Sequence, residues 1–202
     1  MFAPPPTGID ITERTEAFKG YFKIERYKLR HELFEGGWSN LVTREVFERG
    51  HAAAILPYDP HLKAFVLCRQ FRIGAHAGGM PPWQIELVAG IIEDGEKPED
   101  VARREAVEEA GVTVSDVIPI SHYAVSPGGT SETVYLYLGR VDSSKAGGLH
   151  GVPDEDEHIE VQVVTEDDFR TMIDTGVIAN ASTLLAGLWF FLNRDKVIAQ
   201  WT

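Results

Sequence analysis

Apolar and polar residues alternate with a period of two along the first part of the chain, which is the pattern of half-buried β-strands. The alternation runs from residue 18 to residue 47 and is interrupted at 35–38 by Glu-Gly-Gly-Trp, a typical turn signal. Two or three strands of this length need a further surface to pack on. The pattern therefore predicts an antiparallel β element within residues 1–50, either an annex to a sheet or a dimerisation element exchanged between two copies of the chain.

Strands and helices are mixed without strict alternation in residues 51–202. Apolar runs predict strands, and Gly- and Pro-rich stretches predict a turn and a loop between them. The predicted strands are 52–56, 64–71, 83–89, 117–125, 133–140 and 159–164, with the turn at 57–60 and the loop at 74–82. Helices are predicted at 98–110, at 165–175 after a capping signal, and from Asn180 or Ser182 to Leu192. This order favours an α/β domain with one mixed sheet flanked by helices over a doubly wound parallel fold.

Composition and charge narrow the class of protein. With 202 residues, 44% apolar and 25% charged, the chain has the composition of a folded globular protein. The formal net charge of −12 repels nucleic acid and anionic membranes, so we expect neither as a partner. An anionic small molecule would need local basic residues or bridging cations to bind against this field.

The only cysteine, Cys68, lies in an apolar run at 64–68. A single cysteine excludes a disulfide framework within the chain and suits a reducing compartment. We expect a small buried hydrophobic residue here rather than a nucleophile. The opening residues lack the basic start and apolar stretch of a signal peptide, and no run approaches a membrane span, so the sequence predicts a cytoplasmic protein.

Three carboxylates lie on one face of the helix predicted at 98–110. Glu105 and Glu109 are four residues apart, with Glu108 beside them, and like charges at this spacing repel. Oxygen ligands without a neighbouring His or Cys suit a hard divalent cation such as Mg²⁺ or Mn²⁺. The alternative is a solvated acidic face in which Arg104 and Glu108 form an ordinary ion pair.

The residues around this helix favour the metal-binding alternative. Residues 90–112 match the pattern G-x5-E-x7-R-E-U-x-E-E-x-G-U, where U is apolar, at every fixed position: Gly90, Glu96, Arg104, Glu105, Glu108, Glu109 and Gly111. This segment resembles the Nudix box, and the chain is identified as a member of the Nudix hydrolases. One local difference is Lys97, where such boxes often carry Ser or Thr, so we expect a side-chain cap of the helix to be missing.

The resemblance implies a fold, a reaction class and a metal site. It implies an α/β/α sandwich with a mixed sheet, to which the N-terminal antiparallel β element is added, and hydrolysis of a nucleoside diphosphate linked to another group. It also implies two or three Mg²⁺ ions, with Mn²⁺ possible, held by Glu105, Glu108, Glu109 and the backbone carbonyl of Ala89. Arg104 belongs to the catalytic group with Glu108, and its expected role is to tie the carboxylates together.

A second resemblance concerns the substrate. The run Ser-Pro-Gly-Gly-Thr-Ser-Glu at 126–132, with Pro127 placed 16 residues after Gly111, resembles the bacterial ADP-ribose pyrophosphatases. In those enzymes the segment similar to residues 42–53 contacts ligand from the partner subunit, which implies a homodimer. The residues implied to bind substrate are Tyr21, Arg44, Glu45, Arg49, Arg72, Ser126 and Glu132. Surface ion pairs for the arginines and core packing for the tyrosine remain the alternatives.

An acidic run at 150–158 supplies the candidates for the general base and for a further metal ligand. As a charge run it is usually a solvated loop, but the family takes its general base from a loop in this position. By position Glu155 resembles the base and Glu157 a further metal ligand, with His122 and His158 as rival bases. The implied reaction converts ADP-ribose to AMP and ribose 5-phosphate. The alternatives are another nucleotide sugar, such as GDP-mannose, and a non-catalytic Nudix module that senses a ligand.

Overall fold

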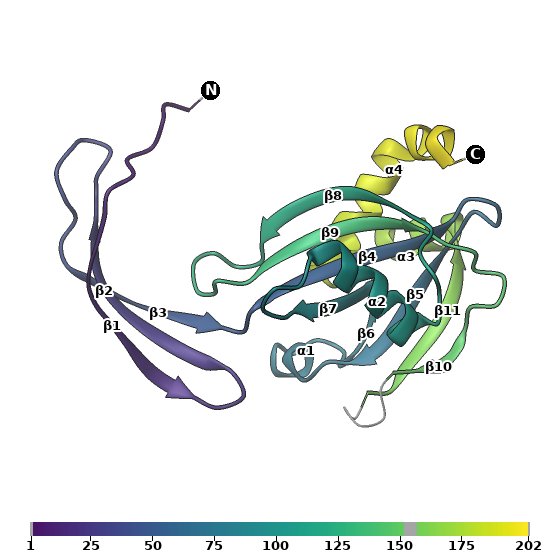
Figure 1. The fold of residues 1–202 in the computed structure, drawn as a ribbon, viewed down its shortest axis with the longest axis horizontal. Coiled ribbons are helices and arrows are strands. Elements are labelled where there is room, and N and C mark those ends of the chain that lie inside the picture. Colours follow the sequence, from purple (N-terminus) through teal and green to yellow (C-terminus); the bar gives the residue numbers. More distant parts are fainter. Residues whose placement is uncertain (1, 152–156, 202) are drawn as a thin grey trace. The chain divides into compact units, whose positions relative to one another are not determined.

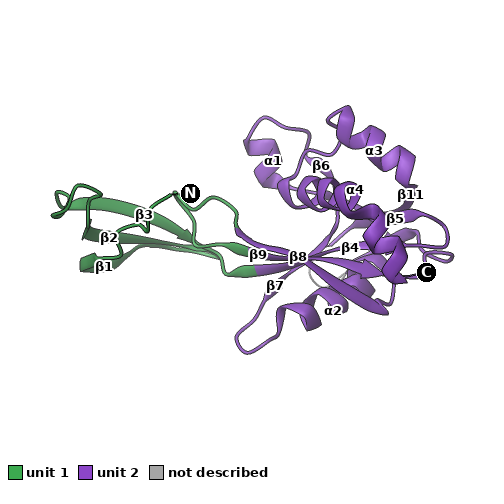
Figure 2. Ribbon diagram, turned by 90° about the horizontal axis from the view of Figure 1, so that it is seen from above, with its two compact units in different colours: residues 1–51, 124–133 green, residues 52–123, 134–202 purple. Residues whose placement is uncertain are grey.

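The computed structural model describes residues 2–151 and 157–201, which fall into two compact units (Figures 1 and 2). Unit 1 comprises residues 1–51 and 124–133, and unit 2 comprises residues 52–123 and 134–202. No helix in the described part of the chain is long and apolar enough to cross a membrane.

The described residues of unit 1 form a three-stranded antiparallel sheet, in the order β1 (Ile9–Lys19), β2 (Lys23–His31) and β3 (Val42–Glu48). The predicted turn before β3 is present, and Gly36 and Gly37 both have positive φ there. The strand β1 was not predicted, because its sequence is largely charged. It forms through pairing with β2, supported by cross-strand ion pairs such as Lys28 Nζ to Glu13 at 2.7 Å.

The sheet of unit 1 leaves much of its apolar surface exposed. Its buried charge is Glu25, which accepts hydrogen bonds from Lys23, Tyr27 and Arg14. These bonds, that of Lys23 first, lower the pKa of Glu25 to about 2. The large apolar side chains that remain exposed are Ile9, Ile11, Phe18, Tyr21, Phe34, Trp38 and Leu41. Both hydrophobic core clusters of the structure consist of residues of unit 2.

The described residues of unit 2 build an eight-stranded mixed sheet. Its main path runs β10-β11-β5-β4-β9-β8, with β6 paired to β5 and β7 paired to β4. The strands are β4 (His51–Asp59), β5 (Ala64–Phe71), β6 (Trp83–Glu86), β7 (Val88–Ile92), β8 (Asp116–Ala124), β9 (Thr133–Arg140), β10 (Gly148–His150) and β11 (Ile159–Thr165). The pair β4 and β9 is parallel, whereas β5 runs antiparallel to β4, β6 and β11.

Helices cover both faces of this sheet, which gives the predicted α/β/α sandwich. The helices are α1 (Ile73–Ala77), α2 (Pro98–Ala110), α3 (Glu166–Asp174) and α4 (Ala181–Trp201). Alternate residues of β4 enter two different cores, because successive side chains of a strand point to opposite faces. Leu56 packs with Phe169 of α3 and Phe190 of α4, whereas Ile55 packs with Val101 of α2.

Several predicted element boundaries were wrong. The predicted turn at 57–60 begins later, because β4 continues to Asp59, whose buried carboxylate accepts the N–H groups of His61 and Leu62. The predicted loop at 74–82 contains all of α1 except its first residue, and the predicted strand at 83–89 is two strands separated at Leu87. The helix α4 extends past Leu192 because Val197 and Trp201 are buried in the core.

Candidate active site

The helix α2 occupies the predicted residues, and its sequence explains both ends. Pro98 starts the helix, and Gly111 ends it in the left-handed conformation at φ 65°, which a glycine adopts without strain. Lys97 makes no side-chain cap, as its residue type predicted. The alanines of the buried face, Ala102, Ala106 and Ala110, are fully buried and bring the helix close to the sheet.

Close packing of α2 on β7 presses two of the box carboxylates against the strand. A Cβ on Gly90 would collide with the carboxylate of Glu105, so any larger residue at this position would displace that carboxylate from the strand. The side chain of Glu109 is 4% exposed, and its Oε2 accepts the backbone N–H of Ala89 at 3.1 Å. Glu105 and Glu109 therefore lie directly beside the strand that carries Ala89.

Burial makes these two carboxylates unusually basic. Desolvation, together with the charges of Glu105 and Glu157, raises the pKa of Glu109 to about 8, against the hydrogen bond from Ala89. Burial also raises the pKa of Glu105, against the opposing charge of Arg104. Buried carboxylates of this kind lack sufficient positive charge around them, so a bound cation would stabilise their ionised forms.

Arg104 ties the exposed edge of the helix together. Its Nη1 lies 2.8 Å from Glu105 and 2.9 Å from Glu108, and its other terminal nitrogen lies 3.7 Å from Glu96. Glu96 in turn accepts the N–H of Glu93 at 2.9 Å, which closes the loop that precedes α2. The ion pair expected for a solvated acidic helix is therefore present, but as part of a network that includes the half-buried Glu105.

The donor set suits a hard divalent cation. It consists of carboxylate oxygens and the Ala89 carbonyl, the oxygen-only ligands that Mg²⁺ and Mn²⁺ prefer. Within residues 2–151 and 157–201, no group of three or more His, Cys, Asp or Glu side chains is drawn together closely enough to enclose an ion. The carboxylates instead line one face of α2, and the raised pKa of Glu109 marks the place where positive charge would be most stabilising.

One candidate substrate-binding residue, Arg72, and one candidate metal ligand, Glu157, lie close enough to Glu109 to affect its pKa. Arg72, at the end of β5, lowers this pKa, and Glu157, ahead of β11, raises it. Arg72 Nε also donates to Glu86 Oε2 at 2.9 Å. Unit 2 thus brings Arg72 and Glu157 toward the box carboxylates. Glu155 lies outside the described residues.

The rival bases are His122 and His158. The ring of His122 stacks on Tyr135 with a centroid separation of 3.9 Å, and the side chain of His158 is exposed. Neither ring is among the largest influences on the pKa of Glu105 or Glu109.

The remaining substrate-binding candidates belong to unit 1. Arg49 Nε lies 3.5 Å from Glu132 Oε1, and the Arg49 guanidinium lies over the ring of Phe22. Arg44 donates to the carbonyl of Thr43, Glu45 pairs with Arg26, and both are exposed. Tyr21 is 91% exposed and Ser126 is also exposed. Of these candidates, Arg49 and Glu132 form an ion pair with each other within unit 1.

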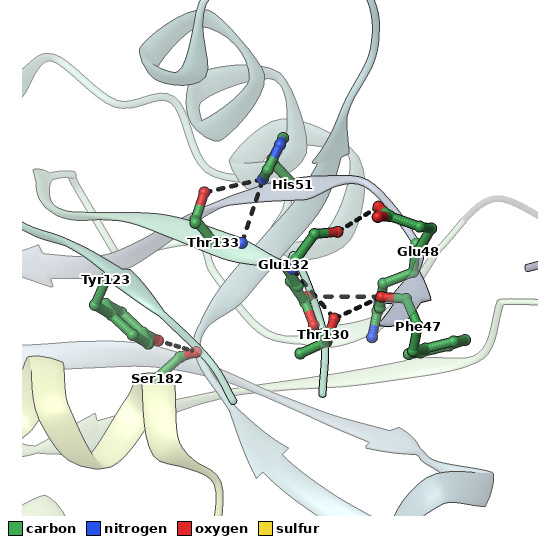
Figure 3. Close-up of polar contacts among 10 residues, drawn as sticks. Phe47, Glu48, His51, Tyr123, Thr130, Glu132, Thr133 and Ser182 are labelled. Atoms are coloured by element: carbon green, nitrogen blue, oxygen red, sulfur yellow. Dashed lines mark hydrogen bonds and ion pairs between the residues drawn. The ribbon is translucent and has the colours of Figure 1, made fainter. Parts of the chain in front are cut away.

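Hydrogen bonds attach the loop at 126–132 to the end of β3, as Figure 3 shows. The Phe47 N–H donates to Gly129 O at 2.8 Å, and Thr130 Oγ1 donates to Phe47 O at 2.9 Å. The hydroxyl of Ser131 donates to Glu48. Sequence reasoning missed these anchoring residues, because no local signal connects partners 83 residues apart.

Known proteins resemble this chain over most of its length. The family model for the NUDIX domain matches residues 48–185. The ADP-ribose pyrophosphatases of Escherichia coli (strain K12) and Haemophilus influenzae are 44% and 39% identical to it, each over 96% of this chain and over 92% and 90% of their own lengths. A GDP-mannose pyrophosphatase of Cronobacter sakazakii is 39% identical over 70% of this chain and 74% of its own.

A solved structure matches the fold at low sequence identity. It is described as the crystal structure of an ADP compounds hydrolase, and it aligns with a TM-score of 0.72 and 19% identity over 98% of both chains. At this identity the likeness concerns the fold alone. With the box carboxylates packed on β7 and a family model covering residues 48–185, the chain belongs to the Nudix hydrolase family.

Proposed function

We propose that this enzyme hydrolyses the pyrophosphate bond of ADP-ribose, giving AMP and ribose 5-phosphate. The observation that carries the reaction class is the pair of box carboxylates packed on β7, the buried Glu109 beside Ala89 and the half-buried Glu105 beside Gly90. The substrate is supported by the relatives named ADP-ribose pyrophosphatase, which align with 96% of the chain and so include the N-terminal sheet.

The residues assigned to hold metal are the Ala89 carbonyl, Glu105, Glu108, Glu109 and, as a further ligand, Glu157. Mg²⁺ is the assigned ion, with Mn²⁺ as its substitute and two or three ions per site. When bound, the ions neutralise charge on the diphosphate and make the attacking water more acidic. They also offset the net charge of −12, which by itself repels an anionic substrate.

The other assigned residues bind the substrate, accept the proton of the attacking water or hold the metal ligands in place. Glu155 is the general base, and Arg104 keeps Glu105 and Glu108 in place by its ion pairs. Guanidinium groups are suited to diphosphate oxygens, because their donors match the geometry of two phosphate acceptors. The assigned substrate contacts are Tyr21, Arg44, Glu45, Arg49, Arg72, Ser126 and Glu132.

The active form proposed here is a homodimer in which the N-terminal sheet is exchanged between two copies. Support comes from the exposed apolar residues of unit 1, which a single copy leaves in water. A second copy of the same element would cover them in a closed two-fold arrangement.

The proposed compartment is the cytoplasm. Cys68 is 3% exposed, and burial raises the pKa of its thiol, so the group remains protonated and unreactive. A chain whose single thiol is buried needs no oxidising environment to fold.

The substrate assignment is tested by comparing nucleotides side by side in the presence of Mg²⁺. We expect the purified chain to release AMP and ribose 5-phosphate from ADP-ribose with a kcat/KM well above those for GDP-mannose, NADH and diadenosine polyphosphates. A preference for GDP-mannose would assign the chain to the other group of relatives. Tight binding of ADP-ribose without any turnover would indicate a sensing module instead.

We expect Glu155→Gln to lower kcat by roughly two to four orders of magnitude, because the amide cannot accept the proton of the attacking water. Binding of ADP-ribose, measured calorimetrically with Ca²⁺ in place of Mg²⁺, should change little. His158→Ala is the matched variant from the same segment and should keep most of its activity. If instead His158→Ala shows the large loss and Glu155→Gln a small one, the base is misassigned.

A further inference from the structure

The strand that carries Ala89 begins at a break in the sheet. The chain pairs with β5 through β6 and with β4 through β7, so it changes partner at Leu87. Leu87 is 4% exposed, so water has little access to its backbone. A buried N–H at such a break needs an acceptor from elsewhere in the fold.

Two side chains at the start of α4 bond to the backbone on both sides of this break. Thr183 Oγ1 accepts the N–H of Leu87 at 2.8 Å, and Asn180 Nδ2 donates to the carbonyl of Ile85 at 2.6 Å. Asn180 Oδ1 also accepts the N–H of Thr183 at 3.0 Å, which caps the helix and links the two residues. Thr183 is fully buried, so water cannot replace its hydroxyl without a rearrangement of the core.

The segment held in this way leads directly to the box carboxylates. Ala89 lies two residues beyond Leu87, and its N–H donates to Glu109. Gly90 follows, in contact with Glu105 so close that a side chain there would displace the Glu105 carboxylate. Because ligands must be held to within about 0.5 Å of their working geometry, a small shift of β7 would disturb the Ala89 carbonyl and both glutamates together.

We propose that Asn180 and Thr183 are positioning residues for the divalent-metal site, which they hold by fixing the start of β7. Neither residue belongs to the box, and neither is assigned a contact with metal or substrate. The proposal rests on the proposed function, because it takes Ala89, Glu105 and Glu109 as metal ligands.

The test compares Thr183→Val, which has the same shape without the acceptor, with Thr183→Ser, which keeps the hydroxyl. Binding of Mn²⁺ to the full chain without substrate is measured by electron paramagnetic resonance. We expect Thr183→Val to weaken Mn²⁺ affinity about ten- to hundredfold, the range for residues that orient metal ligands, and Thr183→Ser to stay within about twofold of wild type. The Mg²⁺ concentration for half-maximal hydrolysis should rise in parallel, with little change in KM for ADP-ribose at saturating Mg²⁺.

Asn180→Asp is a second variant, chosen because it keeps the cap at the start of α4. The carboxylate still caps the N–H of Thr183, but it cannot donate to the Ile85 carbonyl. Weaker Mn²⁺ binding is expected here too, with the helix cap retained.

Ser182→Ala is the matched control, because Ser182 lies in the same turn but its hydroxyl is hydrogen-bonded to Tyr123 of β8 at 2.7 Å (Figure 3). Its Mn²⁺ affinity should equal that of wild type. Wild-type affinity in Thr183→Val and Asn180→Asp would overturn the positioning role, as would an equal loss in Ser182→Ala. A wild-type chain that binds no Mn²⁺ and hydrolyses no ADP-ribose would contradict the proposed function itself.

Discussion

The Glu109→Gln variant is expected to lose nearly all hydrolase activity while keeping its fold. The amide removes the metal ligand that we propose at this position. Such a ligand contributes on the order of several kcal/mol of transition-state stabilisation, so kcat should fall by roughly three orders of magnitude or more. The matched control is Glu99→Gln on the same helix, whose carboxylate is exposed and pairs with Arg103. Near-normal turnover of Glu109→Gln at saturating Mg²⁺ would contradict the metal assignment.

The same substitution should change how the stability of the metal-free protein depends on pH. Burial raises the pKa of Glu109 from 4.5 to about 8, so between these values the folded state holds a proton that the unfolded state releases. The contribution of this group to the free energy of unfolding therefore falls as pH rises from 4.5 to about 8. Urea unfolding of wild type in chelator should show this decline, and Glu109→Gln should show less of it and be more stable at pH 8.

Mixing two inactive variants is expected to restore activity if the arginines serve the opposite subunit. In a dimer of one Arg49→Ala chain and one Glu109→Gln chain, one site carries both changes and the other carries neither. Random association of equal amounts should restore roughly a quarter of the wild-type sites. The measurement is ADP-ribose hydrolysis after co-refolding, with mixed dimers verified by two affinity tags. Mixed dimers without recovered activity would contradict the exchanged arrangement.

Deletion of residues 1–47 tests the same arrangement by a different route. It removes β1, β2 and nearly all of β3, including Phe47, whose backbone holds the loop at 126–132. We expect an inactive or aggregating protein, although every box carboxylate remains. A monomer near the 22.4 kDa mass of the full chain that is fully active by itself, or a deletion variant with full activity, would refute the dimer proposal.

Local signals in the sequence were sufficient for the helix that carries the box. These signals are the proline at its start, the glycine after its end and the spacing of its carboxylates. All of them act within a few residues, so they can be recognised without knowledge of the fold. The absent cap at Lys97 and the burial of Cys68 were predictable for the same reason. The reaction class also follows from this local segment.

Other features depended on partners distant in the chain. β1 is a charged segment that becomes a strand through its pairing with β2. The end of β4 was misjudged because the Asp59 carboxylate accepts the N–H of Ser143, a distant partner that turn residues do not reveal. The short helix α1, which has no buried residue, was not predicted within the loop at 74–82. Pattern alone cannot distinguish one long strand from two strands that change partner at a buried residue such as Leu87.

The sequence by itself was sufficient to identify the family, the candidate metal-binding carboxylates and the helix on which they lie. Motif spacing, helix caps and periodicity all depend on residues close together in the chain. Only the tertiary structure decided that Glu109 is buried and Glu105 half-buried against β7, and that the loop at 126–132 is bonded to β3. It also decided that Asn180 and Thr183 bond to the backbone at the break at Leu87. These are contacts between residues separated by 15 to 96 positions, from Gly90 and Glu105 to Leu87 and Thr183. Their formation depends on which surfaces meet when the core closes, and that is a property of the whole chain.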